Sequence, residues 1–262
     1  MIPKTIHYCW FGHNPKPQLV VNCMKSWKKY CSDYQLVEWN EESFDIANAP
    51  VYVQQAYDAK KWAFVTDYVR LYALYSFGGV YMDTDVEVIK KLDDFLQLKG
   101  FSGFEDTQNV PTGIMAAEKG MPLIKNWLEE YDTKQFLLPD GTLNTETNVI
   151  TITRNMKDRG LQLDNTLQII SDFSFFPKEF FCPKSYSDGI IYKTKNTHTI
   201  HHFAGSWLSE EERKHHKREV IISRREKRTR PIKNLVKRIV GDSVYTRIKN
   251  IIKHAPKEEG YK

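Results

Sequence analysis

The sequence predicts an α/β fold in which a mainly parallel central sheet is flanked by helices. Residues 4–10 and 35–39 have strand-like composition and enclose an amphipathic helical pattern over residues 17–30, which is the β-α-β order of a parallel sheet. A second helix-then-strand pattern covers residues 61–87 and ends in an Asp-x-Asp sequence. Because α/β sheets bind ligands at the carboxyl ends of their strands, this position favours a functional site.

The first expected helix is amphipathic. Its apolar residues recur at helical spacing and form one stripe, which consists of Leu19, Val20, Cys23, Met24 and Trp27. The second expected helix carries Asp67 and Arg70 three positions apart, so their side chains share one helix face. Gly78-Gly79 ends that helix, since glycine adopts the left-handed conformation at low cost. The apolar run 80–82 then predicts a short buried strand.

Asp83 and Asp85 emerge where this strand meets a loop. Carboxylate oxygens in that position suit a Mg²⁺ or Mn²⁺ ion that holds a diphosphate. A chain with 33 acidic residues is expected to contain about one Asp-x-Asp sequence by chance. A solvated turn is therefore the alternative interpretation of this pair taken alone.

The later elements are expected in the same alternation. Residues 93–104 predict a short helix and a returning strand, residues 110–117 a loop and a strand, and residues 121–131 an amphipathic helix. A further helix is expected after Asn144, with Asn144 or Thr145 as its N-cap.

The block from Asp67 to Asp85 is more specific than its final Asp-x-Asp. The pattern Asp67-x-x-Arg70…Gly78-Gly79-Val80-Tyr81-x-Asp83-x-Asp85 resembles the core of the glycosyltransferases of family 32. That family includes capsule and lipopolysaccharide sugar transferases and initiating mannosyltransferases, and the block also resembles the large clostridial glucosylating toxins. The resemblance implies a GT-A-type fold, a nucleotide-diphosphate sugar donor and a divalent metal, Mn²⁺ or Mg²⁺.

Two further segments agree with this resemblance. The opening from Ile2 to Gly12 is similar to the family's first strand, which implies that Trp10 stacks on the nucleotide base. A core tryptophan near a strand end is the alternative. Residues 199–207 resemble the family's C-terminal His-x-x-x-x-Ser-Trp element, which implies that Ser206 and Trp207 contact the phosphate and the leaving-group oxygen.

The resemblance also implies roles for the remaining site residues. Asp83 and Asp85 would hold the metal with one histidine of the adjacent pair His201 and His202, since neutral imidazole is a common ligand. One buried and one solvated histidine on a strand is the alternative. The expected catalytic residues are Asp67, Arg70, Asp83 and Asp85. The expected donor-binding residues are Trp10, Thr66, Asp67, Arg70, Tyr81, Asp83, Ser206 and Trp207.

The implied reaction is a retaining transfer of a hexose to a hydroxyl group of a saccharide. Asp67 would accept hydrogen bonds from sugar hydroxyls, and Arg70 would pair with a phosphate or sugar oxygen. No residue stands out as a covalent nucleophile, which favours front-face substitution with the diphosphate taking the acceptor proton. Trp10 and the opening strand favour a uridine donor, with UDP-galactose first, in the synthesis of a bacterial capsular or other surface polysaccharide.

The C-terminal part of the chain is strongly basic. Residues 213–254 contain 15 Lys and Arg against 3 Asp and Glu, so the rest of a chain with net charge +5 has a net charge of −7. Apolar residues continue at helical spacing, and they are Ile232, Leu235, Val236, Ile239, Val240, Val244, Ile248, Ile251 and Ile252. We therefore expect a glycosyltransferase domain over residues 1–212 and a basic amphipathic tail over residues 213–262, which begins a helix near Pro231 and binds an anionic membrane surface.

Two other interpretations of the tail stay open, namely a helix packed on the body and a nucleic-acid contact. The acidic body and the absence of a recognition motif disfavour nucleic acid. The first ten residues contain no long apolar run, and the four cysteines lack metal-type spacing, so we expect reduced thiols, no signal peptide and a cytoplasmic protein on the inner face of the plasma membrane.

Two alternatives to a transferase remain. A haloacid-dehalogenase-type phosphatase would use Asp83 as its nucleophile, although Glu87 stands where that family has Thr or Val. A non-enzymatic peripheral membrane adaptor would depend on the basic tail alone.

Overall fold

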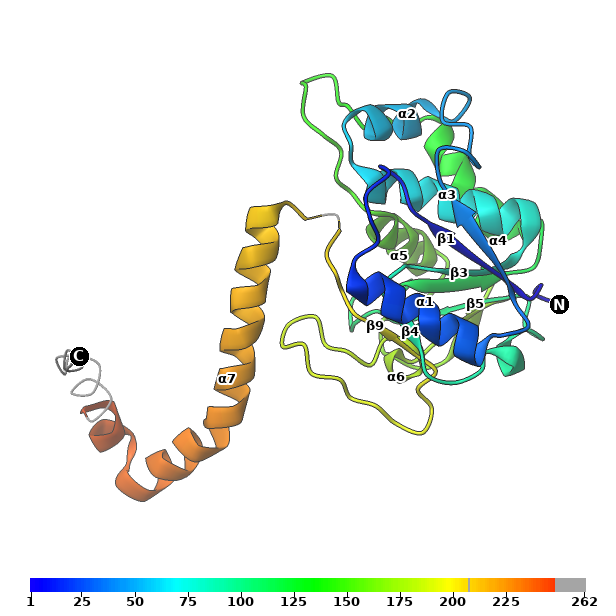
Figure 1. The fold of residues 1–262 in the computed structure, drawn as a ribbon. Coiled ribbons are helices and arrows are strands. Elements are labelled where there is room, and N and C mark those ends of the chain that lie inside the picture. Colours follow the sequence, from blue (N-terminus) through cyan, green and yellow to red (C-terminus); the bar gives the residue numbers. More distant parts are fainter. Residues whose placement is uncertain (207, 248–262) are drawn as a thin grey trace. The chain divides into compact units, whose positions relative to one another are not determined.

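A computed structural model describes residues 1–206 and 208–247. In this part of the chain a seven-stranded sheet has the strand order β2-β1-β3-β6-β5-β8-β7 (Figure 1). The strands are β1 (Thr5–Cys9), β2 (Gln35–Trp39), β3 (Gly79–Met82), β5 (Gly100–Gly103), β6 (Ile114–Ala117), β7 (Gln168–Ile170) and β8 (Phe173–Phe176).

Five of these seven strands run in the same direction, and β6 and β7 are reversed. The mainly parallel sheet of an α/β fold, expected from the sequence, is therefore confirmed. The β1-α1-β2 unit also has the expected bounds, because its short-range sequence pattern is sufficient to determine it.

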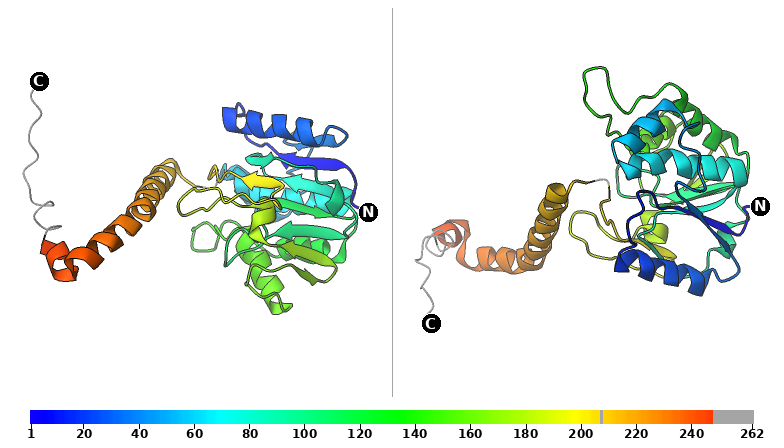
Figure 2. Two further views of the ribbon diagram at one scale, coloured as in Figure 1. Left: turned by 90° about the horizontal axis from the view of Figure 1, so that it is seen from below. Right: turned by 45° about the horizontal axis from the view of Figure 1, so that its top comes forward.

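Helices cover both faces of the sheet, as Figure 2 shows from two further directions. One face packs against residues of α2 (Val51–Asp58), α3 (Trp62–Phe77), α4 (Pro122–Glu129) and α5 (Asn148–Asp158). The other face packs against α1 (Gln18–Tyr30), α6 (Lys178–Phe181) and the short helix η1 (Asp93–Phe95). Strand residues alternate between the two faces, so Tyr81 faces the α3 side whereas Val80 and Met82 face the α1 side.

A second, two-stranded sheet joins β4 (Val86–Val88) to β9 (Thr199–His201) in antiparallel register. Trp27 of α1 is fully buried beneath β4 and donates a hydrogen bond from its indole Nε1 to the carbonyl oxygen of Val86 at 2.7 Å. The amide of Val88 also bonds to α1, through the hydroxyl group of Ser26 at 2.9 Å. Helix α1 therefore fixes the strand that follows Asp85.

The passage from α3 to β3 depends on two glycines with left-handed backbone, since φ is 67° at Gly78 and 111° at Gly79. A Cβ atom on Gly79 would lie 2.7 Å from the carbonyl oxygen of Thr5, so no other residue fits there. The buried imidazole of His7 bonds to the carbonyl oxygen of Gly78 through Nε2 at 2.8 Å, and Trp39 donates to its Nδ1 at 3.2 Å. The bend before β3 is thus fixed from both sides.

The expected cap of α5 is wrong. The helix begins at Asn148 after Thr147, which makes no side-chain cap bond. The side-chain oxygen of Asn144 instead accepts the amide of Glu146 in a local turn at 3.2 Å. The amide of Asn148 bonds to Asp67, so a tertiary contact sets the start of this helix.

The described chain divides into two units, residues 1–186 with 190–213, and residues 187–189 with the segment that follows from Lys214. The second unit contains α7 (Glu210–Val240), whose first residues precede that division. Pro231 lies inside α7, so the expectation that a helix begins there is wrong. The helix ends before Gly241, which has φ of 77°. Among the described helices, none combines the length and the apolar composition that crossing a membrane requires.

We expect Trp27→Phe to destabilise the protein by about 1–3 kcal/mol, because it leaves the buried carbonyl group of Val86 without its donor while most of the ring volume remains. Urea unfolding followed by circular dichroism measures this difference. A change below about 0.5 kcal/mol would show that α1 does not hold β4 through this bond.

Candidate metal and nucleotide-sugar site

The Asp-x-Asp segment forms a tight turn at the end of β3. The amide of Val86 bonds back to the carbonyl oxygen of Asp83 at 2.9 Å, and the amide of Asp83 bonds to the carbonyl oxygen of Gly113 at 2.8 Å. This turn brings the carboxylates of Asp83 and Asp85 close together. A Cβ atom on Gly113 would lie only 3.0 Å from Asp83 Oδ2, so the neighbouring loop has no room for a side chain there.

His201 joins these carboxylates from a distant part of the chain. Its strand β9 pairs with β4 so that His201 lies opposite Val86. His201 Nε2 is 3.4 Å from Asp85 Oδ1 and 3.9 Å from Asp83 Oδ2. One ligand atom from each of Asp83, Asp85 and His201 lies within 4.8 Å of the others, which is an arrangement that could hold a metal ion.

His202, the other histidine of the pair, faces elsewhere. Its Nε2 bonds to Glu87 Oε2 at 2.9 Å, whereas its backbone amide bonds to the carbonyl oxygen of Asp85 at 3.0 Å. Adjacent residues on a strand point to opposite faces. Of the two candidates, the structure therefore brings His201 to the aspartates and His202 to Glu87.

The backbone after β9 folds around Asp85. The amide of Ala204 donates to Asp85 Oδ2 at 2.6 Å, and the preceding Phe203 has φ of 55°, an unusual value for a residue other than glycine. Burial alone would raise the pKa of the Asp85 carboxyl, but the His201 ring and the Ala204 amide hold it below its usual range. Burial likewise disfavours charged His201, yet Asp85 raises its pKa well above the usual value.

Arg70 connects the metal-binding turn to helix α3. Its Nη2 lies 3.3 Å from Asp67 Oδ1 and 3.2 Å from Asp83 Oδ1. Its guanidinium carbon lies 4.7 Å from the centre of the Tyr81 ring, and Tyr81 donates its hydroxyl hydrogen to Asp83 Oδ1 at 2.9 Å. The expected residues Asp67, Arg70, Tyr81 and Asp83 thus form one network, in which only Asp83 is partly exposed.

Asp67 is 95% buried and sits at the amino end of α5. Its Oδ2 accepts the amide of Asn148 at 3.0 Å, a favourable place for a carboxylate. Burial raises the pKa of Asp67 to about 6, against the opposing influence of Arg70 and the Asn148 amide. The side-chain oxygen of Asn148 is itself buried without a hydrogen-bond donor among the described residues.

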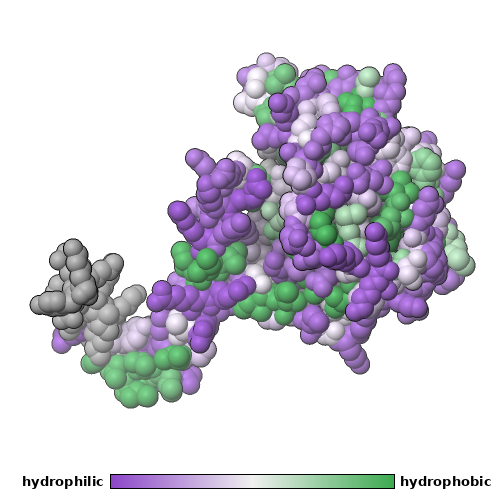
Figure 3. All heavy atoms as spheres, viewed as in Figure 1, coloured by the Kyte–Doolittle hydropathy of each residue, from purple (hydrophilic) through white to green (hydrophobic). Residues whose placement is uncertain are grey.

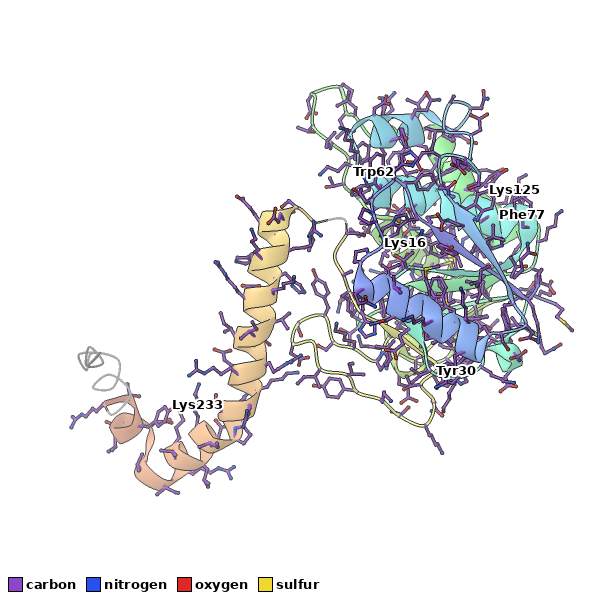
Figure 4. The ribbon with its side chains drawn as sticks, viewed as in Figure 1. Lys16, Tyr30, Trp62, Phe77, Lys125 and Lys233 are labelled. Carbon is purple, nitrogen blue, oxygen red and sulfur yellow. The ribbon has the colours of Figure 1, made fainter. Side chains whose placement is uncertain are left out.

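Trp10 follows β1 at the same edge of the sheet, because β1 and β3 are parallel with His7 opposite Tyr81. Its ring is partly exposed and its Nε1 donates to the carbonyl oxygen of Asn14 at 2.7 Å. Lys16 Nζ lies 5.4 Å from the ring centre. Figure 4 labels Lys16 and Trp62, whose side chains come from the loop after β1 and from the start of α3.

The other expected donor-binding residues differ in how far they join this network. The partly buried Thr66 lies near the thiol of Cys9, which is close to Arg70 and Asp83 at the end of β1. Ser206 is exposed in a turn, without a contact to the aspartates in this structure. Trp207 lies outside the described residues.

The sequence interpretation missed Glu105 at this site and Trp62 behind the loop that follows β1. Glu105 follows β5 and places its Oε1 3.4 Å from His201 Nδ1. Trp62 packs on Gly12, where a Cβ atom would lie 2.6 Å from the indole ring. The position of Glu105 after a strand of the same direction as β3 was a usable signal. Trp62 had no comparable signal, because its partner Gly12 lies 50 residues away.

Comparison with known proteins gives a consistent result. A family model described as "Glycosyltransferase sugar-binding region containing DXD motif" matches residues 17–101. Inositol phosphoceramide mannosyltransferase 3 of Schizosaccharomyces pombe is 32% identical over 127 residues, which are 47% of this chain and 35% of that protein. Glucan organizing enzyme 1 of Cryptococcus neoformans is 26% identical over 153 residues, 55% of this chain and 37% of that protein.

The chain therefore spans little more than a third of these curated relatives. Among solved structures, the PaToxG glycosyltransferase has a TM-score of 0.44 and 20% identity, and the match covers 60% of this chain and 69% of that one. The family match confirms the resemblance drawn from the block between Asp67 and Asp85.

We expect the buried Asp67 to make stability fall as the pH rises. Its pKa is about 6 in the folded protein and 3.8 in a model peptide, so the stabilisation of the protonated form is complete below pH 3.8 and is lost as the pH rises through 6. Compared with Asp67→Asn, the free energy of unfolding of the wild type should fall by about 3 kcal/mol across this pH range. Urea unfolding of both proteins from pH 4 to pH 7.5 measures the difference in their free energies of unfolding. A difference that does not change with pH would contradict this prediction.

Proposed function

We propose that this protein transfers a hexose from a nucleotide-diphosphate sugar to a hydroxyl group of a saccharide. The match of residues 17–101 to the family of glycosyltransferase sugar-binding regions that contain a DXD motif supports this proposal. The observation that carries the proposal is the group of Asp83, Asp85 and His201 next to the buried pair of Asp67 and Arg70. The first group suits a metal and a diphosphate, and the second suits a sugar.

The residues present fit a divalent metal ion. Two carboxylates and one imidazole are the mixed oxygen and nitrogen donors that Mn²⁺ accepts, and Mg²⁺ is the second choice because it prefers oxygen donors. Asp83, Asp85 and His201 Nε2 would hold the ion. When bound, such an ion supplies Lewis-acid neutralisation of the diphosphate leaving group.

The chain's own residues would orient the donor. Arg70 Nε is buried without a hydrogen-bond partner among the described residues, so one donor of this guanidinium is available to a phosphate or sugar oxygen. Asp67 would accept a hydrogen bond from a sugar hydroxyl group. Tyr81 and Arg70 hold Asp83 in place before the ligand arrives, which lowers the cost of assembling the site.

Within this function we propose a retaining reaction and a UDP-sugar donor, with UDP-galactose first. Front-face substitution, in which the diphosphate takes the acceptor proton, requires no nucleophile from the protein. The acceptor would be a saccharide, either free or lipid-linked, in the synthesis of a bacterial capsular or other surface polysaccharide. Three of the relatives are named inositol phosphoceramide mannosyltransferases, so a mannose donor is the competitor to be tested beside the UDP-sugars.

Metal removal tests the central part of this proposal. EDTA should abolish release of nucleotide from the donor, and Mn²⁺ or Mg²⁺ should restore it. Asp85→Asn should lower the rate by at least about 100-fold, since it removes a charge that is buried in the site, with an unchanged circular dichroism spectrum. Full turnover in the chelator would contradict the metal site. Release of phosphate instead of nucleoside diphosphate would favour the phosphatase alternative, and no turnover of any donor would favour the adaptor.

Trp10 tests the nucleotide. If its partly exposed ring stacks on the base, Trp10→Ala should weaken UDP binding by about 1–3 kcal/mol while leaving the metal site intact. Calorimetric titration with UDP and GDP in the presence of Mn²⁺ measures both the affinity and the choice of base. Tight GDP binding without UDP binding would overturn the uridine assignment, and equal affinity of the variant would remove Trp10 from the site.

We also propose that the C-terminal segment binds an anionic membrane surface and places the protein, as a cytoplasmic enzyme, on the inner face of the plasma membrane. Figure 3 shows apolar side chains gathered in patches on this segment among hydrophilic ones. Exposed fractions are 63% for Ile232, 59% for Leu235 and 74% for Ile239, and α7 contains no buried residue. Basic residues such as Lys233, labelled in Figure 4, accompany this stripe.

Replacement of Ile232, Leu235 and Ile239 together by Asn should therefore reduce sedimentation with anionic vesicles by at least about tenfold, because each loses roughly 1 kcal/mol or more of apolar burial. Donor turnover in solution should not change. Binding of the wild type should also weaken as salt rises, since charge attraction is screened over about 8 Å at physiological ionic strength. A wild-type protein that ignores anionic vesicles at low salt would exclude the tether.

A further inference from the structure

The two ring nitrogens of His201 have different surroundings. Nε2 faces Asp83 and Asp85 at 3.9 and 3.4 Å. Nδ1 lies on the other side of the ring, where it is buried and makes no hydrogen bond of normal geometry within the described residues. The Glu105 carboxylate approaches this nitrogen, with its Oε1 at 3.4 Å.

The backbone of Glu105 is firmly held. It follows β5, which runs in the same direction as β3, so Glu105 reaches the sheet edge at which Asp83 lies. The amide of Glu105 bonds to the carbonyl oxygen of Asn109 at 2.9 Å, and its carbonyl oxygen accepts Lys178 Nζ at 2.6 Å. Its side chain therefore starts from a fixed position beside the imidazole.

The His201 ring is also confined in other directions. The Phe203 ring lies against it with a centroid separation of 4.3 Å. A Cβ atom on Gly113 would lie 3.1 Å from Nδ1, so the Gly113 backbone closes a further side. An imidazole that binds a cation through Nε2 carries its hydrogen on Nδ1, and a buried N–H group without an acceptor is unfavourable.

We propose that Glu105 is a positioning residue, which accepts the Nδ1 hydrogen of His201 and so aims the Nε2 lone pair at the position between Asp83 and Asp85. Histidine ligands commonly donate their second ring N–H to a carboxylate in this way. The inference rests on the proposed metal site and adds Glu105 to it. Glu105 is not one of the three residues whose ligand atoms lie close enough together to hold the ion, and it approaches the imidazole at Nδ1.

Two nearby groups provide controls. Cys182 also lies near the His201 ring, but a thiol is a weak hydrogen-bond partner. Glu87 pairs with His202 just as Glu105 is proposed to pair with His201, and that pair faces away from the aspartates. Glu87→Ala therefore removes a carboxylate from a histidine of the same segment without touching His201.

The experiment measures Mn²⁺ binding to the full-length protein by the loss of the electron paramagnetic resonance signal of free Mn²⁺. Glu105→Ala should raise the dissociation constant about 10- to 100-fold, the range known for such supporting residues. Glu105→Gln should recover part of that loss, because its amide oxygen can still accept the Nδ1 hydrogen. Glu87→Ala and Cys182→Ala should change the dissociation constant for Mn²⁺ by less than about threefold.

Equal losses in Glu105→Ala and Glu105→Gln would mean that only the charge matters, and that result would overturn the positioning role. A loss in Glu105→Ala no larger than in Glu87→Ala would overturn it too. A nuclear magnetic resonance experiment on metal-free protein provides the second readout, namely a slowly exchanging Nδ1–H proton of His201 that disappears in Glu105→Ala. If the wild type binds no Mn²⁺, the proposed metal site is wrong, and this proton alone decides whether Glu105 holds the ring.

Discussion

The pairing of β4 with β9 is the constraint on which the site depends. It joins two segments more than 100 residues apart and sets His201 opposite Val86, one residue after Asp85. A shift of this register by one residue would turn His201 away and bring His202 toward the aspartates, since side chains alternate along a strand. The indole of Trp27 holds β4 from one side, and the amides of His202 and Ala204 hold Asp85 from the other.

Burial of like charges is the second physical feature of this site. Asp67, Asp83 and Asp85 lie within one network, and buried carboxylates are unfavourable unless each is paired. Arg70 pairs with the first two and His201 with the third, so three carboxylates face two cationic side chains and their charge is only partly compensated. A cation that enters beside His201 would take over the compensation of Asp83 and Asp85, while Arg70 would remain with Asp67. This division explains why the guanidinium lies between the two groups.

The parts of the fold that depend on interactions between residues close in the chain could be predicted from the sequence. The β1-α1-β2 unit and the bend at Gly78-Gly79 were predictable, because periodicity and glycine conformation act over a few residues. The start of α5 was not, since Asn148 bonds to Asp67 from 81 residues away. Pro231 failed as a helix start for a related reason, because the preceding residues from Glu210 on already form α7.

The candidate site was predictable only to the level of residue types. The pattern around Asp67 and Asp83 indicated the family whose model matches residues 17–101. Strand register decided between His201 and His202, and no local pattern contains that information. Glu105 follows a strand that runs in the direction of β3, which was a usable signal for the site, but no local pattern showed that it approaches His201. Whether Ser206 joins the site is still a prediction, since the structure shows it exposed in a turn.

The most direct test is a crystal structure with Mn²⁺ and UDP, in which anomalous scattering locates the ion without any assumption about activity. The account predicts a single strong peak within bonding distance of Asp83, Asp85 and His201 Nε2, with the diphosphate on its open side. A peak at Glu87 and His202, or a diphosphate bound without any ion, would contradict it.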